Sequence, residues 1–199
     1  MSPRTTAQSE QMRATAVASI LKAAQEVFGE RGFFGGSTDE VARRAGVSKG
    51  LVFNYFKTKD DLLEALLEQH LSYALSVWES DPPSGTPEER LTQIFDRTVD
   101  HVLAQVNSYR LYYSLLFHPG VNPALQAAAQ RVKYRVAAYY AMLIETFSGD
   151  TTRAVLFQAS MNGIVQFLIL QPDLQQRREE FPIAAMRERL ITSSLQDKS

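Results

Sequence analysis

Residues 37–61 read STDEVARRAGVSKGLVFNYFKTKDD, and this stretch decides the fold. Ser37 is followed three residues later by Glu40, the pattern of a capping box, so we expect a helix to start here. Gly46 can adopt the left-handed backbone conformation that a sharp turn needs, and it should end this short helix. Ser48 can cap the next one. The stretch therefore predicts two helices joined by a glycine turn, the pattern of a helix-turn-helix.

Apolar residues explain how the two helices would be held together. Val52 and Phe56 lie four apart on one face of the later helix, where they can meet Val41 and Ala42, with Val47 filling the corner. The other face is then free to enter a DNA major groove, which is wide enough for one α-helix. A helix-turn-helix also occurs as plain packing between helices, so this pattern alone leaves both interpretations open.

Helical periodicity continues on both sides of this stretch. It predicts a helix over about residues 10–30 that ends at Gly32, and a long helix that begins near Lys59. Beyond a Pro/Ser/Gly linker at 81–85, caps and periodicity predict helices over about 86–105, 108–117, 122–147, 150–171 and 181–195. The sequence has no alternating β-branched runs with hairpin turns. We therefore predict an all-α fold of about nine helices.

Composition and charge narrow the function classes. The chain has 199 residues, 45% of them hydrophobic, and no cysteine, which excludes a disulfide framework and thiolate metal sites and favours a cytoplasmic location. The net charge is −1, but residues 41–59 hold five bases and no acid. A basic segment on a mildly acidic remainder suits nucleic acid recognised at one end, and it equally fits a solvated helical face.

The N-terminus and two stretches without charged side chains bear on whether the chain is exported or crosses a membrane. The N-terminus has no apolar stretch behind its single arginine, so we expect no secretory signal and no membrane partner. Residues 111–130 and 154–172 lack charged side chains, but proline and glycine break the first, and several amides lie in the second. We expect both stretches to form buried helices of a soluble protein.

Together with Gly32, the stretch from Ser37 to Leu62 resembles the N-terminal signature of the tetracycline-repressor (TetR) family of one-component bacterial regulators. The similarity covers about residues 12–65, and residue type, order and spacing agree over some thirty positions. The resemblance implies an N-terminal three-helix DNA-binding domain over residues 1–58. It also implies a C-terminal helical bundle for effector binding and dimerisation over residues 59–199.

In that family the start of the recognition helix meets base edges. Lys49 is then the best direct reader, because lysine can donate to guanine O6 and N7. The DNA-contacting residues that the resemblance implies are Thr38, Ser48, Lys49, Gly50, Leu51, Phe53, Asn54, Tyr55 and Lys59. Leu51 and Asn54 stand where the family often has a hydroxyl residue and histidine, so no operator sequence can be borrowed from a relative. Arg43 and Arg44 would either add electrostatic attraction or be solvated residues of their helix, and Arg4 and Arg13 could reach the DNA backbone from a flexible arm.

The resemblance also implies a small-molecule effector pocket in the C-terminal helices. Its expected lining is His101, Tyr112, Tyr113, Phe117, Tyr139, Phe157, Met161, Asn162 and Gln166. Taken singly, aromatic and methionine residues at helical spacing are usually plain core. The two amides, Asn162 and Gln166, could orient a ligand or instead hydrogen-bond a dimer partner.

A C2 homodimer is the expected assembly, because it presents two recognition helices to a palindromic operator. Small residues make one face of the helix over 150–171 suitable for close packing. The expected dimer interface is Ala159, Ser160, Gly163, Phe167, Ile183, Leu190 and Ile191.

We therefore expect a ligand-responsive repressor that binds double-stranded DNA as a dimer and is released by a small apolar or amphipathic effector. One alternative is a helical protein that binds small molecules without sequence-specific DNA binding. Another is a small all-α enzyme, which the sequence supports least. His70, His101 and His118 lack metal-ligand spacing, and no nucleophile elbow or phosphate-binding glycine loop is present. No catalytic residue, metal or cofactor is assigned.

Overall fold

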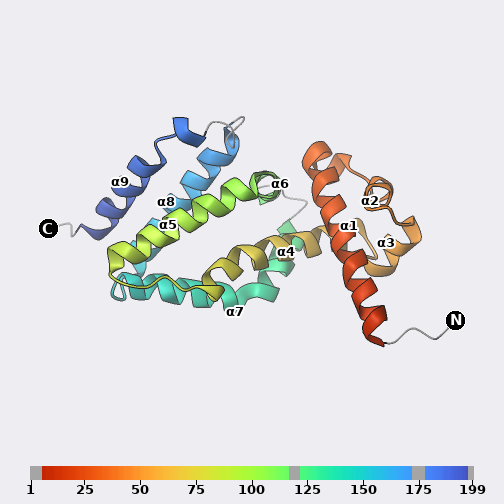
Figure 1. Ribbon diagram of the computed structural model, residues 1–199, viewed down its shortest axis with the longest axis horizontal. Coiled ribbons are helices and arrows are strands. Elements are labelled where there is room, and N and C mark those ends of the chain that lie inside the picture. Colours follow the sequence, from red (N-terminus) through yellow and green to blue (C-terminus); the bar gives the residue numbers. More distant parts are fainter. Residues whose placement is uncertain (1–5, 117–121, 172–177, 197–199) are drawn as a thin grey trace. The chain divides into compact units, whose positions relative to one another are not determined.

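The computed structural model describes residues 6–116, 122–171 and 178–196, and these ranges contain helices and no strand (Figure 1). The α-helices are α1 (Thr6–Gly35), α2 (Thr38–Ala45), α3 (Lys49–Tyr55), α4 (Lys59–Ser80), α5 (Pro87–Ala104), α6 (Val106–Leu116), α7 (Asn122–Thr146), α8 (Thr151–Leu170) and α9 (Ile183–Leu195). A short 3-10 turn, η2 (Arg178–Glu180), precedes α9. The described ranges thus confirm the all-α fold and its nine α-helices.

The described residues form two compact units. The N-terminal unit holds residues 6–70, 111–116 and 122–130, and the C-terminal unit holds the remaining described residues. The chain passes between the units within α4, α6 and α7, whereas the sequence places the boundary at residues 58 and 59. The early leucines of α4 are all buried, in keeping with their place in the N-terminal unit: Leu62, Leu63, Leu66 and Leu67.

α1 buries one apolar stripe in the N-terminal unit. Ile20, Ala24 and Phe28 lie at helical spacing and are at most 1% exposed. The helix bends at Gly32, whose φ of 70° lies in the left-handed region that glycine adopts without strain. Beyond the bend, the buried Phe33 meets Phe28 edge to face, with 5.3 Å between ring centroids. The sequence predicts that the helix ends at Gly32, whereas in the structure α1 bends there and continues to Gly35.

α2, the turn and α3 follow the predicted pattern closely. The Glu40 N–H donates to the Ser37 hydroxyl at 3.2 Å, and the Ser37 N–H donates to the Glu40 carboxylate at 3.3 Å, which completes the capping box. Gly46 has a φ of 68° and ends α2 in the left-handed conformation. Val41 and Val52, from α2 and α3, are both fully buried. The helix-turn-helix is therefore formed by packing as well as by its caps.

The C-terminal unit is organised by α5, α8 and α9, which contact one another. Thr86 and Glu89 form a second capping box at the start of α5, as the sequence predicts. An ion pair between Arg187 and Asp96, 2.7 Å at its shortest, joins α9 to α5. The core side chains that α5 and α8 bury include Leu91, Ile94, Phe95, Val99, Phe157, Met161, Val165, Leu168 and Ile169.

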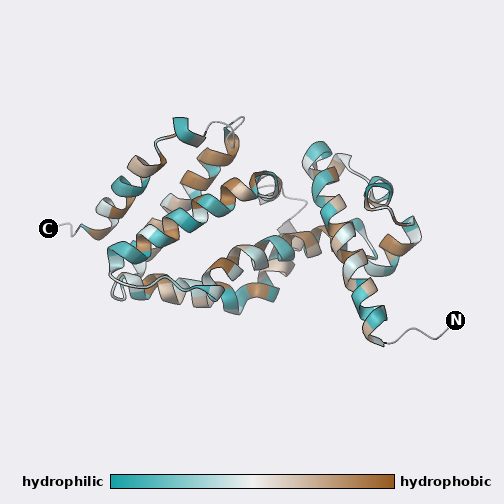
Figure 2. Cartoon of the chain, in the orientation of Figure 1, coloured by the Kyte–Doolittle hydropathy of each residue, from teal (hydrophilic) through white to brown (hydrophobic). Residues whose placement is uncertain are grey.

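α8 is apolar on more than one side, and apolar residues recur along it (brown in Figure 2). Among the described helices it alone is long and apolar enough to cross a membrane, and a third of its most apolar window is buried. The interpretation of residues 154–172 as a buried helix is therefore only partly right. Leu156, Phe167 and Leu170 are 61%, 46% and 71% exposed. Exposed apolar patches of this kind mark interaction sites.

Candidate functional site

α3 is anchored by buried side chains and presents its first turn to solvent. Val52 is fully buried and Phe56 is 8% exposed, and both hold the helix against the N-terminal unit. Lys49, Gly50 and Asn54 are exposed. The half-buried residues of α3 are Leu51, Phe53 and Tyr55. The residues expected to meet base edges are therefore accessible at the start of α3.

Three further residues of the expected contact set have distinct local settings. The Ser48 hydroxyl accepts a hydrogen bond from the Leu51 N–H at 3.2 Å and so caps α3. A Cβ added at Gly50 would meet no atom within 4 Å, so packing within the described protein does not require a glycine there. Thr38 is the first residue of α2 and is half-buried.

Lys49 is already engaged within the N-terminal unit. Its Nζ lies 2.7 Å from the Asp39 carboxylate, which comes from the first turn of α2. The same Nζ lies 5.8 Å from the centroid of the Phe53 ring, one turn further along α3. Both partners of the ion pair remain more than half exposed. A residue expected to read bases is thus accessible while its charge is paired.

Lys59 begins α4 against two aromatic rings. Its Nζ lies 4.5 Å from the centroid of Phe33 and 5.6 Å from that of Phe28, distances at which a ring attracts a cation. Burial lowers the pKa of Lys59, while the neighbouring Asp60 opposes this shift. The rings fix the position of an ammonium group beside the amides of a helix N-terminus, a combination that suits a phosphate.

Arg13 belongs to α1 rather than to a flexible arm. Its guanidinium lies 5.9 Å from the centroid of the Tyr55 ring of α3. The expectation of a flexible arm is therefore wrong for Arg13, because the helix extends back to Thr6. Arg4 lies outside the described residues.

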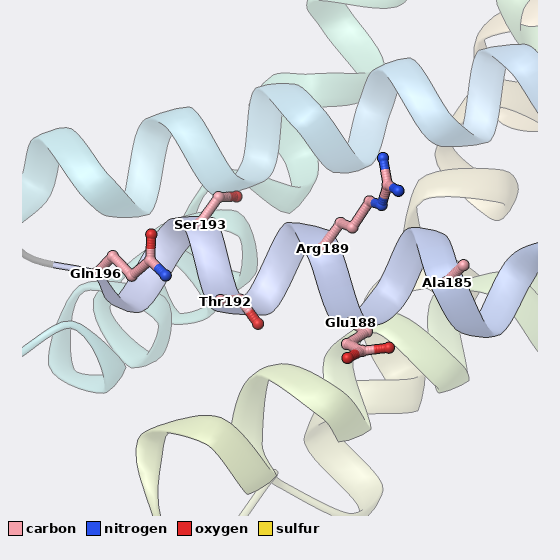
Figure 3. A pocket seen from close by; sticks show the side chains of 6 residues that line it. All are labelled: Ala185, Glu188, Arg189, Thr192, Ser193 and Gln196. Carbon is pink, nitrogen blue, oxygen red and sulfur yellow. The ribbon is translucent and has the colours of Figure 1, made fainter.

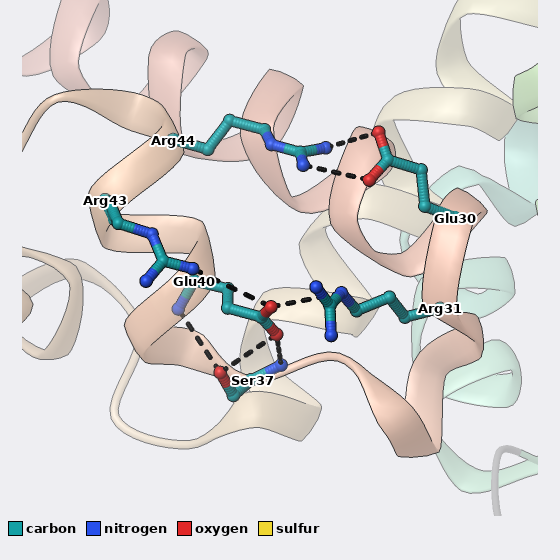
Figure 4. Close-up of polar contacts among 6 residues, drawn as sticks. All are labelled: Glu30, Arg31, Ser37, Glu40, Arg43 and Arg44. Atoms are coloured by element: carbon teal, nitrogen blue, oxygen red, sulfur yellow. Dashed lines mark hydrogen bonds and ion pairs between the residues drawn. The ribbon is translucent and has the colours of Figure 1, made fainter.

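Arg43 and Arg44 are both paired with acids (Figure 4). Arg44 donates two hydrogen bonds to the Glu30 carboxylate, at 2.6 and 2.9 Å, and thereby joins α2 to α1. Glu40 lies 3.0 Å from Arg31 and 3.8 Å from Arg43. The Arg44 hydrogen bond is the main cause of the lowered pKa of Glu30. These arginines stabilise the arrangement of α1 and α2, a role that the sequence alone does not distinguish from attraction of DNA.

The family model for bacterial regulatory proteins of the tetR family matches residues 20–66. This range contains α2, the turn, α3 and the start of α4 with Lys59. This part of the chain is similar to the TetR family. The match confirms the resemblance carried by the stretch from Ser37 to Leu62.

Bacterial regulators match part of the chain. The fatty acid metabolism regulator protein of Bacillus subtilis is 31% identical over 103 residues, which cover 49% of this chain and 53% of that protein. The transcriptional activator FasR of Mycolicibacterium smegmatis is 33% identical over 95 residues, 47% of this chain and 43% of FasR. The chain thus spans about half the length of the curated relatives it matches. The solved structure of the multidrug binding protein EbrR, complexed with malachite green, is 26% identical with a TM-score of 0.70, covering 91% of this chain and 98% of EbrR.

Two tyrosines of the expected TetR-type effector pocket lie in the N-terminal unit. The His70 ring stacks on Tyr112 with 4.8 Å between centroids, and Tyr113 meets Tyr112 edge to face at 5.7 Å. Burial raises the pKa of Tyr112, and burial together with Tyr112 raises the pKa of Tyr113 to about 12. Both hydroxyls are therefore neutral hydrogen-bonding groups at physiological pH. Phe117 lies outside the described residues.

His101 has the most unusual setting of the expected pocket residues. Its ring lies between Tyr73, 4.6 Å away by centroids, and Tyr109, 5.7 Å away. The Nε2 atom is buried and has no hydrogen-bond partner among the described residues. Burial lowers the pKa of His101, so the ring is neutral at pH 7. Tyr73 was not among the predicted residues, because helical spacing alone does not show that it meets His101.

The α7 and α8 members of the expected pocket divide into core and surface. Phe157 and Met161 are 1% and 2% exposed and belong to the core of the C-terminal unit. The Tyr139 hydroxyl donates to the Gln158 side chain at 2.6 Å, and Gln158 in turn donates to the Asn162 carbonyl oxygen at 3.0 Å. Asn162 is exposed, as is its neighbour on the same face, Gln166. Exposure of both amides favours the alternative that they meet a dimer partner.

Two cavities in the C-terminal unit border α9. One, of about 610 Å³, is an open groove along α9 lined by Ala185, Glu188, Arg189, Thr192, Ser193 and Gln196 (Figure 3). The other, of about 300 Å³, separates α9 from Glu88 and Thr92 of α5. Neither of these two contains a residue of the expected effector pocket. No three His, Asp or Glu side chains come together as metal ligands in the ranges that the structure describes.

The expected dimer-interface residues are mostly accessible. On α8, Ala159, Ser160, Gly163 and Phe167 are exposed and share the face that carries Leu156. On α9, Ile183 and Leu190 are half-buried, but Ile191 is only 5% exposed. Ile191 is therefore buried within the chain itself, unlike the other expected interface residues of α9. Ile191 lies on the α9 face that borders α5, together with Ala184 and Arg187 at helical spacing.

Proposed function

We propose that this protein is a DNA-binding transcription regulator of the bacterial cytoplasm. It binds a palindromic operator as a homodimer and leaves the operator when a small apolar or amphipathic effector binds. The observation that carries the proposal is the accessible first turn of α3, with Lys49 and Gly50, on a helix anchored by the buried Val52 and Phe56. A rigid helix with an exposed N-terminal turn is what a major groove admits.

Contacts to the DNA backbone are proposed for the residues that flank this turn. Lys59 holds an ammonium group at the start of α4 in a position fixed by Phe28 and Phe33. Asn54, Tyr55 and Thr38 supply polar groups at the end of α3 and the start of α2. Phosphate contacts set the position of a protein on DNA without reading sequence. Leu51 and Phe53 then supply apolar contact to bases, such as a thymine methyl group.

Homodimerisation is supported by the uncovered face of α8. Leu156 and Phe167 are exposed there, and Ala159 and Gly163 between them would let a second helix approach closely. A homodimer covers such a face with the same face of a second copy, as a C2 interface requires. Asn162 and Gln166 on this helix would supply hydrogen bonds across the interface. Ile183 and Leu190, which are half-buried on α9, would extend it.

Effector binding is supported by the aromatic surroundings of His101 and by the relatives. The buried, unpartnered Nε2 can hydrogen-bond a ligand, and Tyr73 and Tyr109 offer it flat apolar surfaces. Tyr139, which belongs to the same unit as His101, is a further proposed contact. The structure of EbrR is a complex with malachite green, and the Bacillus subtilis relative is named for fatty acid metabolism. Both names favour an effector that is largely apolar.

The effector must bind the released form more tightly than the DNA-bound form. Reversing a 99:1 preference between two forms takes about 10⁴-fold differential affinity, or roughly 5.5 kcal/mol. A ligand that binds both forms equally would shift nothing, however tightly it binds.

Selection from a library of random DNA duplexes by the purified protein tests the proposal. We expect enrichment of one inverted-repeat sequence, whose half-sites are spaced by about one helical turn or a multiple of it. Light scattering at micromolar concentration should give the mass of a dimer. Enrichment of no sequence by a correctly folded protein would overturn the proposal and favour a ligand-binding protein without sequence-specific DNA binding.

A further inference from the structure

Asp39 and Lys49 form the only ion pair that the described residues place across the helix-turn-helix, between α2 and α3. The Asp39 carboxylate lies 2.7 Å from the Lys49 Nζ, and the two side chains are 61% and 58% exposed. Each therefore stays accessible to a third group. Asp39 stands two residues before the basic stretch that runs from Val41 to Lys59 without another acid.

The geometry leaves Lys49 with donors to spare. An ammonium group has three N–H donors, and the carboxylate occupies one side of it. Phe53 lies 5.8 Å away on the same helix and supports the lysine from another side. A neutral acceptor that approaches the exposed side can therefore bind Lys49 while the Asp39 pair is kept.

We propose that Asp39 is a specificity-determining residue that directs Lys49 to bases rather than to phosphates, an inference that rests on the proposed function. Guanine O6 and N7 are neutral acceptors, so Lys49 can donate to both without leaving Asp39. A phosphate is an anion, and its approach to Lys49 brings it close to the Asp39 carboxylate. Repulsion between the two anions opposes that approach and weakens binding to DNA of the wrong sequence.

The test compares Asp39→Asn with the wild type on the duplex that the wild type selects and on an unrelated duplex of equal length. Dissociation constants are measured by fluorescence anisotropy over a series of salt concentrations. Glu26→Gln is the matched control, because it removes one negative charge from an exposed position of the same unit that lies on α1 rather than on α2 or α3. Circular dichroism establishes that each variant is folded, and Asp39→Ser serves as a second variant.

We expect Asp39→Asn to bind the unrelated duplex more tightly. The dissociation constant for the unrelated duplex, divided by that for the selected duplex, should fall by roughly tenfold. For the unrelated duplex, the slope of log affinity against log salt concentration should steepen by about 0.9, the value for one added phosphate contact. In a Lys49→Ala background, Asp39→Asn should leave the ratio unchanged. Glu26→Gln should behave as the wild type.

Three results would overturn the inference. One is an unchanged ratio for both Asp39 variants, and another is an equal loss of selectivity in Glu26→Gln, which would indicate a general effect of charge. The third is a persisting effect of Asp39→Asn without Lys49. If the wild type selects no duplex at all, the proposed function fails, and this inference fails with it.

Discussion

Arg44 and Glu30 face one another across α2 and α1, joined by two hydrogen bonds of 2.6 and 2.9 Å. The pair links α1 and α2, the first two helices of the N-terminal unit, and it lies near the end of α1, close to the bend at Gly32. Because both side chains are accessible to water, solvent screens the attraction. The pair therefore fixes the angle between the helices more than it raises overall stability.

Replacing Glu30 with glutamine should produce a small fall in Tm at neutral pH. Arg44 holds the pKa of Glu30 below its usual value, so the stabilisation is present above pH 4.5 and is lost as the pH falls through the folded-state pKa. The difference in Tm between Glu30→Gln and the wild type should accordingly shrink between pH 5 and pH 3. Thermal unfolding monitored by circular dichroism measures it, and a difference that grows in acid would contradict the assignment.

Phe28→Ala should be far more damaging than a change at the surface. Phe28 is 1% exposed and packs on Phe33, so its removal leaves a cavity and should lower the free energy of unfolding by about 3–5 kcal/mol. It also removes one of the rings that hold Lys59. The matched control is Phe34→Ala, since Phe34 is 59% exposed. Urea unfolding of both variants would count against the assigned core if their losses were equal.

Leu156→Glu should convert the proposed dimer into a monomer. The glutamate would leave an uncompensated buried charge in the interface, which costs about 3–5 kcal/mol. This cost should raise the dissociation constant of the dimer by at least about a hundredfold. Tyr134→Glu provides the control, because Tyr134 is 79% exposed on α7. Light scattering across a dilution series reports the masses. A dimer that survives Leu156→Glu at the wild-type dissociation constant would show that α8 is not the interface.

Stability should fall in mild acid because of His101. Burial lowers its folded-state pKa, so the unfolded chain binds a proton more readily as the pH drops below about 6.5, and the native state loses stability there. His101→Gln removes this contribution. The drop in Tm from pH 7.5 to pH 5.5 should thus be smaller for His101→Gln. An equal drop in both proteins would mean that His101 does not titrate in this range.

Much of the helix-turn-helix could be predicted because its determinants are local. Ser37 with Glu40, Gly46 and Ser48 each act on backbone groups within four residues, and the structure has every one of these contacts. The side of α3 that faces the core could be predicted from Val52 and Phe56, because their spacing places both on one face of the helix.

Pairings between distant residues could not be predicted in this way. Nothing in the sequence shows that Arg44 meets Glu30 or that Lys49 meets Asp39. The side chains of Arg44 and Lys49 would also be stable in water without an acidic partner. The two faces of α9 were also beyond prediction. Ile191 and Leu190 are adjacent and equally apolar, and only packing on α5 decides that Ile191 is the buried one.

The most direct test of the account is the ratio between the wild-type dissociation constants for the selected duplex and for an unrelated duplex, measured by fluorescence anisotropy near physiological salt. We predict a ratio of about 10³ or more, as is typical of specific DNA-binding proteins. Lys49→Ala should weaken operator binding by about 1–3 kcal/mol and reduce the ratio, whereas Lys59→Ala should weaken both duplexes alike. A wild-type ratio near one would contradict the claim that α3 reads DNA sequence.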